Sequence, residues 1–336
     1  MQFSKLSRFW KAAGPAGWLS GILKHPVFSN MLSWLVPGLC MAFMYRNLRG
    51  KDFGLLAESA LMLPKEPLFI ITLLLLPLNV SLEALKWKNL LGPVHHIGFM
   101  KALGAVLRGM ALGLAAPHAL GDFAGRSMRM GTISRYSAAG ALALNNLSQY
   151  ICVLGFGMPA WAYYLHRQFP YKPLLPILVL FIGMCFPIAA AILYFRAGRL
   201  AKILSSRYRK PYIEKFLQPA AGYSMGILVR VFSLGLTRYL IYSLQFGLML
   251  HVCGVRTNFA ALCGGIAAVW LAKATVPGLN LLGDLGLREL TALGWFAAFG
   301  VAGEPVAAAA LWLWCINVLI PAGIGLLLLP KFRKII

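Results

Sequence analysis

Long apolar runs are the feature that most constrains how this chain folds. One of the clearest, at residues 67 to 84, contains the stretch "LFIITLLLLPLNV". A helix needs about 20 mostly apolar residues to cross a hydrocarbon core of about 30 Å, because it rises about 1.5 Å per residue. The sequence therefore predicts an all-α, polytopic integral membrane helix bundle. Its candidate spans lie at about residues 31 to 45, 67 to 84, 99 to 116, 137 to 157, 174 to 195, 224 to 250, 258 to 276, 287 to 302 and 306 to 329.

The connections between these runs do not have the composition of a soluble domain. Only 12% of the residues are charged and 60% are hydrophobic, which leaves little material for a separate catalytic domain. We expect one transmembrane domain over residues 31 to 336. Residues 1 to 30 read as an interfacial lead-in, because basic side chains there accompany Phe3, Trp10 and Trp18.

The chain is strongly basic, with 32 Lys and Arg against nine Asp and Glu and a formal charge of +23. Most of these cations flank apolar runs, which favours contact with anionic lipid headgroups over nucleic-acid binding. The positive-inside bias predicts that residues 196 to 215 and 331 to 334 are cytoplasmic. Counting spans backwards then places the basic lead-in outside. Either one element of the first half is miscounted or the lead-in does not decide the orientation.

A short charged motif occurs twice, once in each half of the chain. "GDFAGR" at residues 121 to 126 is matched by "GDLGLR" at residues 283 to 288. A proline precedes each copy, Pro117 in the first and Pro277 in the second, at the end of an apolar run rich in small residues. The pattern predicts two re-entrant or broken helical elements that form a pseudo-repeat.

The spacing of the motif places its acid and its base on one helix face. Asp122 with Arg126, and Asp284 with Arg288, lie four residues apart and are expected to pair. An unpaired charge at the bilayer centre costs about 2.5–3.5 kcal/mol, so each pair must be buried against protein, face a water-filled cavity or lie at the interface. The alternative is an ordinary interfacial loop with a capped helix and a local ion pair.

Other polar side chains interrupt apolar runs. Glu83 and Lys86 are three residues apart and can pair, although Lys86 also fits a membrane-interface anchor. Arg238 and Gln245 share a helix face that could line a polar path, with snorkelling of the arginine as the competing interpretation. The candidate headgroup-binding residues are Glu83, Lys86, Arg108, Pro117, Asp122, Arg126, Arg238, Gln245, Pro277, Asp284, Arg288 and Glu289.

Most motifs for catalysis, metal binding and nucleotide binding are missing from the sequence, and nothing in it points to a Ser-His-Asp constellation. The histidines and cysteines lack the spacing of metal ligands, and no glycine-rich phosphate loop or acidic metal-diphosphate motif occurs. We therefore expect no cofactor, no metal and no catalytic residues, and a transporter rather than an enzyme.

Several stretches resemble the transmembrane region of the lysylphosphatidylglycerol synthase family. They span roughly residues 70 to 295, in the order found in that family, and read "NVSLEALKW", an Arg-Gly pair, "PHALGDFAGR", "NNLSQY", "TRYLIYSLQF" and "VPGLNLLGDLGLRE". The resemblance implies a flippase-like domain with two re-entrant elements that meet near the bilayer centre. We expect this domain to stand alone, without the synthase domain.

Together these features predict a lipid translocase of the bacterial cytoplasmic (inner) membrane. It would move a phospholipid or amino-modified lipid, with an anionic or zwitterionic headgroup, between leaflets through a central polar cavity. The alternatives are a membrane-embedded enzyme that acts on lipid headgroups and an accessory subunit of a separate lipid-modifying enzyme.

Overall fold

The chain folds as an all-α bundle, as the apolar runs predict. The computed structural model describes residues 66–115, 118–128, 133–208, 210–275 and 281–329, and this part of the chain contains no strand. Four helical segments in it are long and apolar enough to cross a membrane. They are α5 (Pro67–Leu91), α9 (Leu174–Phe195), α12 (Met225–Val252) and the continuous run of α15 (Gly303–Trp314), η2 (Cys315–Leu319) and α16 (Ile320–Leu327).

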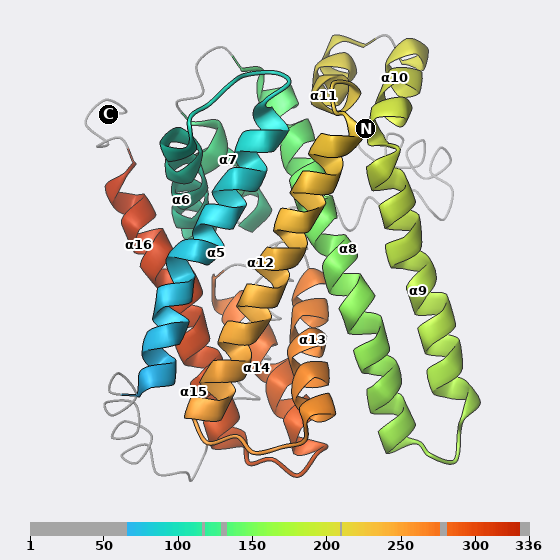
Figure 1. Cartoon of the computed structure of the whole chain (residues 1–336), viewed down its shortest axis with the longest axis vertical. Helices are drawn as coiled ribbons and strands as arrows, with labels where there is room; N and C mark the ends of the chain where they lie inside the picture. Colours follow the sequence, from blue (N-terminus) through green and yellow to red (C-terminus); the bar gives the residue numbers. More distant parts are fainter. Residues whose placement is uncertain (1–65, 116–117, 129–132, 209, 276–280, 330–336) are drawn as a thin grey trace, which may run out of the picture.

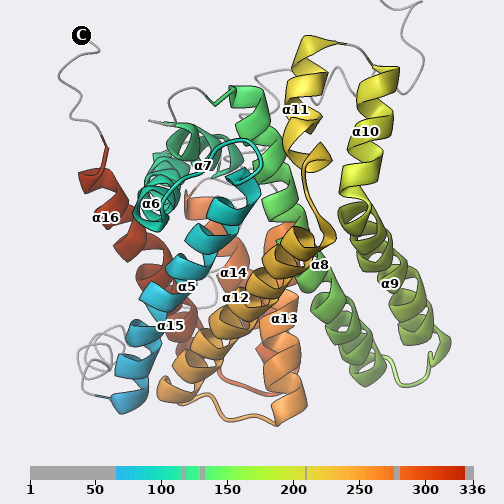
Figure 2. The ribbon, with the colours of Figure 1, turned by 45° about the horizontal axis from the view of Figure 1, so that its top comes forward.

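These long helices lie lengthwise in the bundle, and α12 lies beside α5 (Figures 1 and 2). Helices α16 and α9 lie at opposite sides of the bundle. A further helix, α8 (Arg135–Gln168), is 34 residues long and follows the full length of the molecule. The Ser134 hydroxyl caps its start by accepting a hydrogen bond from the Tyr136 backbone N–H at 3.3 Å. The predicted span at residues 137 to 157 covers only part of α8, because the last turn of the helix carries His166, Arg167 and Gln168 and is polar.

Two helical hairpins occupy opposite halves of the bundle. Helices α6 (Phe99–Ala115) and α7 (His118–Ser127) lie in the upper half of Figure 1, whereas α13 (Phe259–Thr275) and α14 (Leu281–Ala297) lie in the lower half. The longest of these helices has 17 residues, or about 25 Å, which is shorter than the hydrocarbon core. The apolar runs at residues 99 to 116, 258 to 276 and 287 to 302 are therefore arms of hairpins.

Glycines bring the two arms of the upper hairpin into backbone contact. A Cβ atom at Gly121 would overlap the Leu112 carbonyl, and one at Gly125 would overlap the Arg108 carbonyl. Small residues allow this close approach between helices in a membrane, where van der Waals packing replaces the hydrophobic driving force. Gly325 of α16 contacts the Leu107 carbonyl on α6 in the same way. The motif at residues 121 to 126 is thus held directly against α6.

A third, smaller hairpin caps one end of the bundle. The basic connection between α9 and α12 forms α10 (Ala197–Arg207) and α11 (Pro211–Ala221) at the upper end of Figure 1. Gly140 of α8 contacts the Phe216 carbonyl, and the Ser137 hydroxyl donates to the Lys215 carbonyl at 2.9 Å. The predicted lead-in at residues 1 to 30 and the candidate span at residues 31 to 45 lie outside the described residues.

The glycine contacts predict a position-dependent effect of adding one methyl group. Gly125→Ala should lower the stability of the protein by about 1–3 kcal/mol, because the new Cβ would force α7 away from α6. Gly155→Ala is the matched control, since no atom lies within 4 Å of a Cβ built there. Thermal unfolding in detergent micelles measures both, and equal melting temperatures for the two variants would contradict the described packing.

Candidate functional site

A buried carboxylate, that of Glu83, lies at the centre of a cluster of charges inside the bundle. Glu83 is in α5 and is only 4% exposed. Its Oε1 atom is 2.8 Å from Arg126 Nη2 of α7, and its Oε2 atom is 3.3 Å from Lys86 Nζ. Arg238 Nη1, from α12, is 3.4 Å from Oε2. We call these four residues, together with Asp122, the Glu83 cluster.

Helix α8 supplies further hydrogen-bond partners for Glu83 and Lys86. The Asn145 side-chain amide donates to Glu83 Oε1 at 2.8 Å, and its backbone carbonyl accepts from Lys86 Nζ at 3.3 Å. The Ser148 hydroxyl donates to the same carbonyl at 2.7 Å. On the facing helix α12, Gly235 lies beside the lysine, and a Cβ built there would be in ordinary van der Waals contact with it, 3.8 Å from Lys86 Nζ. Four helices thus share one buried ionic site.

Arg126 connects the repeated motif to Glu83. Its Nε atom donates to Asp122 Oδ1 at 2.7 Å, so the pair predicted from the four-residue spacing is present. The guanidinium lies 5.4 Å from the centre of the Trp87 ring, a cation–π contact that helps hold a desolvated charge. Gly109 of α6 makes room for the pair, since a Cβ there would overlap the Asp122 carboxylate.

The cluster carries more positive than negative charge. It contains three cations, Lys86, Arg126 and Arg238, and two carboxylates, Glu83 and Asp122, which leaves a formal excess of +1. Arg126 Nη1 and Arg238 Nε are buried atoms without a hydrogen-bond partner among the described residues. Buried donors and excess charge are costly unless they are compensated, so the arrangement is complementary to an anion.

Gln245 lies in a separate cluster of amides and not beside Arg238. Its side-chain nitrogen donates to the Thr72 carbonyl at 2.9 Å, and its oxygen is 3.4 Å from Asn79 Nδ2. Asn79 Nδ2 also donates to Asn317 Oδ1 at 2.9 Å. Asn317 belongs to η2, the single π-helical turn in the last membrane segment, and such turns are frequent at functional sites. These amides join α5, α12 and η2.

The second copy of the motif lies in α14. Arg288 is fully buried, and its guanidinium is 5.6 Å from the centre of the Trp270 ring on α13. Trp270 in turn stacks on Tyr242 with ring centres 4.4 Å apart. Each motif arginine therefore lies against the tryptophan of a neighbouring helix, and neither arginine is exposed. Glu289 is 1% exposed, and its Oε2 atom has no hydrogen-bond partner in the described part of the chain.

Four candidates remain, and only Arg108 among them has a side chain that the structure describes. Arg108 is 9% exposed, and its Nη2 atom donates to the Met128 carbonyl at 3.4 Å. Asp284 is in the first turn of α14, where only the backbone is described. Pro117 and Pro277 lie outside the described residues. Five of the twelve candidates thus form the Glu83 cluster.

Sequence reasoning assigned no role to Asn145, Asn79 or Asn317, and it interpreted Trp87 only as a membrane-interface anchor. An amide inside an apolar helix is the signal that could have found the three asparagines, because such groups need a partner in a membrane. Asn145 even lies within the stretch "NNLSQY". The cation–π role of Trp87 has no comparable signal, since a tryptophan near a helix end also fits an interfacial belt.

Comparison with protein families gives one match that covers nearly the whole chain. The family model described as the lysylphosphatidylglycerol synthase TM region matches residues 28–325. Comparisons with curated proteins and with solved structures gave no match.

The coordination of Glu83 predicts that its charge is required for stability. Glu83→Gln would leave three cations, two of them buried, opposite one carboxylate and should lower the stability by about 3–5 kcal/mol, as expected when one partner of a buried ion pair is removed. Glu214→Gln, on the exposed surface of α11, should have little effect. Adding Lys86→Met to Glu83→Gln should recover part of the loss. Thermal unfolding that leaves Glu83→Gln as stable as the parent chain would contradict this interpretation.

Proposed function

The chain belongs to the lysylphosphatidylglycerol synthase transmembrane-region family, and we propose that it is a lipid translocase. It is an integral membrane protein that acts on lipids, as the family and the apolar helices show together. In the proposed activity, the headgroup of a phospholipid or amino-modified lipid passes through a polar path inside the bundle while the acyl chains stay in the membrane.

The excess positive charge of the Glu83 cluster is the observation that carries this proposal. A lipid phosphate brings one negative charge and several acceptor oxygens, which match the excess of +1 and the unpartnered atoms Arg126 Nη1 and Arg238 Nε. Glu83 and Asp122 keep the cations in place when no lipid is bound. They also provide contacts for the cationic part of a zwitterionic or amino-modified headgroup.

The two short hairpins supply the second support. We interpret α6–α7 and α13–α14 as re-entrant elements that enter the membrane from opposite faces, since they occupy opposite halves of the bundle. Interrupted helices are tolerated at membrane depth only where protein or water satisfies their backbone, and transporters place substrate sites at such breaks. Each hairpin brings one motif arginine, Arg126 or Arg288, to a buried position.

This interpretation also removes the conflict between the positive-inside bias and the number of spans counted in the first half of the chain. If α6–α7 does not cross the membrane, the connection at residues 196 to 215 lies on the side where α5 ends. The sequence count then has four predicted spans before residue 196 in place of five, so it no longer conflicts with a basic lead-in on that same side. We therefore assign the upper end of Figure 1 to the cytoplasm and the protein to a bacterial cytoplasmic membrane.

The translocase proposal predicts slower lipid movement when a motif arginine is removed. Arg126→Ala and Arg288→Ala should each slow the movement of headgroup-labelled phosphatidylglycerol between leaflets of proteoliposomes by roughly 10- to 150-fold, because a hydrogen bond to a charged group contributes about 1.5–3 kcal/mol. Arg256→Ala, an exposed arginine in the loop before α13, is the control and should transport normally.

Two results would contradict the proposal. Unchanged movement in both arginine variants would remove these residues from the path. A chemically altered lipid in the proteoliposomes would instead indicate an enzyme that acts on headgroups.

The assigned orientation predicts which positions a membrane-impermeant thiol reagent reaches. In a chain whose native cysteines are replaced, Ser206→Cys at the end of α10 should react only from the cytoplasmic side. Lys172→Cys, in the loop before α9 at the opposite end of the bundle, should react only from the other side. Reaction of both positions from the same side would contradict the assignment.

A further inference from the structure

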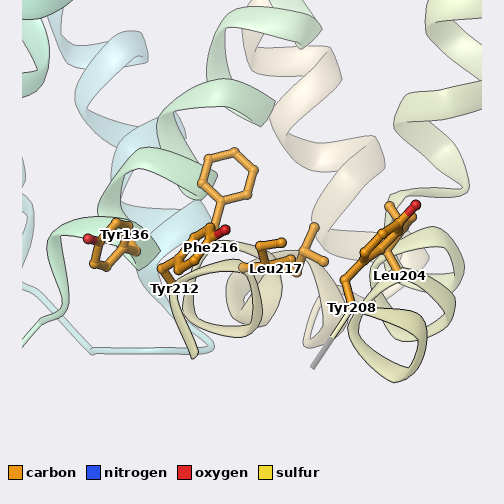
Figure 3. Close-up of a pocket in the computed structure, with 7 residues that line it drawn as sticks. Tyr136, Leu204, Tyr208, Tyr212, Phe216 and Leu217 are labelled. Carbon is orange, nitrogen blue, oxygen red and sulfur yellow. The ribbon is translucent and has the colours of Figure 1, made fainter. Parts of the chain in front are cut away.

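A shallow apolar pocket lies at the end of the bundle, away from the Glu83 cluster. It has a volume of about 310 Å³, near the lower limit for sites that take small molecules. The start of α8 and the α10–α11 hairpin form it. Its lining is entirely aromatic or aliphatic and consists of Tyr136, Leu204, Tyr208, Tyr212, Ile213, Phe216 and Leu217 (Figure 3).

Five of the seven side chains that line this pocket are exposed. Tyr136 is 52% exposed, Tyr208 49% and Tyr212 48%, and both Leu204 and Phe216 are 39% exposed. Contiguous exposed apolar side chains with a polar rim mark interaction sites. Tyrosine, with an apolar ring and a polar tip, is the residue type enriched where a membrane meets water.

Exposed cations are direct sequence neighbours of three residues that line the pocket. Arg135 precedes Tyr136, Arg207 precedes Tyr208 and Lys215 precedes Phe216 in the chain, and all three cations are exposed. The connecting segment of residues 196 to 215 carries seven Lys and Arg against one acid, Glu214, a formal charge of +6. The pocket thus has an apolar lining and belongs to a strongly basic part of the chain, which suits a molecule with an apolar body and an anionic head.

The position of the hairpin in the chain favours a lipid as that molecule. The apolar helix α9 ends at Phe195, and α10 begins two residues later, with Arg196 between them. After α11, the membrane helix α12 begins at Met225. The hairpin therefore joins two membrane-spanning helices at the level where their apolar surface ends and lipid headgroups begin. No transport step is needed for a lipid to reach it.

We propose that α10, α11 and the start of α8 form a second lipid site, separate from the translocation path, which binds an anionic phospholipid of the adjacent leaflet. The acyl region of the lipid packs on Tyr212 and Phe216, and its phosphate lies among Arg135, Arg207 and Lys215. The site anchors the α10–α11 hairpin to an anionic membrane surface and makes the protein sensitive to the anionic lipid content of that leaflet.

Photo-crosslinking of the full chain in vesicles tests this site. Two probes with the same diazirine-bearing acyl chain are used, one with a phosphatidylglycerol headgroup and one with a phosphatidylcholine headgroup. The phosphatidylglycerol probe should label peptides from residues 203 to 217 more strongly than the phosphatidylcholine probe does. Peptides around Phe181, which is 77% exposed on the lipid-facing helix α9, should be labelled equally by both probes.

Variants separate the apolar and ionic parts of the site. Arg207→Gln and Lys215→Gln should each weaken phosphatidylglycerol labelling of the hairpin about fivefold, the effect expected for one cation near an anionic surface. The double substitution Tyr212→Ala and Phe216→Ala should reduce labelling of residues 203 to 217 by either probe. Labelling around Phe181 should not change in any variant, which shows that the bundle remains folded.

Equal labelling of the hairpin by the two probes would overturn the proposal, as would undiminished labelling in the charge variants. Failure of this site is distinguishable from failure of the translocase, because Arg126→Ala should leave hairpin labelling intact.

Discussion

The attraction between one buried carboxylate and three cations holds the centre of this protein together. Glu83 contacts Lys86 on its own helix, Arg126 on α7 and Arg238 on α12, and Asn145 of α8 completes its shell. In a low-dielectric interior such charges are stable only as a group, because each one left alone would cost several kcal/mol. The helices of the central bundle are therefore tied together electrostatically as well as by packing.

Close backbone packing makes this arrangement possible. Helix α7 has only ten residues and cannot cross a membrane, so its position depends on the glycines that hold it against α6. Gly121 and Gly125 bring the two backbones into contact, and Gly109 leaves space for Asp122. Arg126 then extends from α7 to Glu83 across the bundle. Packing of small residues and pairing of charges thus support each other: the first positions the arginine, and the second compensates its burial.

The sequence predicted well those features that depend on one helix alone. The all-α membrane bundle follows from the apolar runs, and the pairs Glu83–Lys86 and Asp122–Arg126 follow from their spacing. Contacts between helices could not be predicted from the sequence. Arg238 and Gln245 share a face of α12 but lie about 10 Å apart along it, so they meet different partners from α5. Apolar composition also could not distinguish the arm of a hairpin from a short span, because both are equally hydrophobic.

The distance between a lipid phosphate and the Arg126 guanidinium tests most directly whether the Glu83 cluster binds a headgroup. Solid-state NMR of the reconstituted chain, with ¹⁵N-labelled arginine and phosphatidylglycerol, measures it through ³¹P–¹⁵N dipolar coupling, and comparison with Arg126→Lys identifies the signal. A buried charge-assisted contact predicts a separation of about 4 Å. An Arg126 signal with no coupling to phosphorus, in a sample where exposed arginines couple to it, would contradict a headgroup site at Glu83.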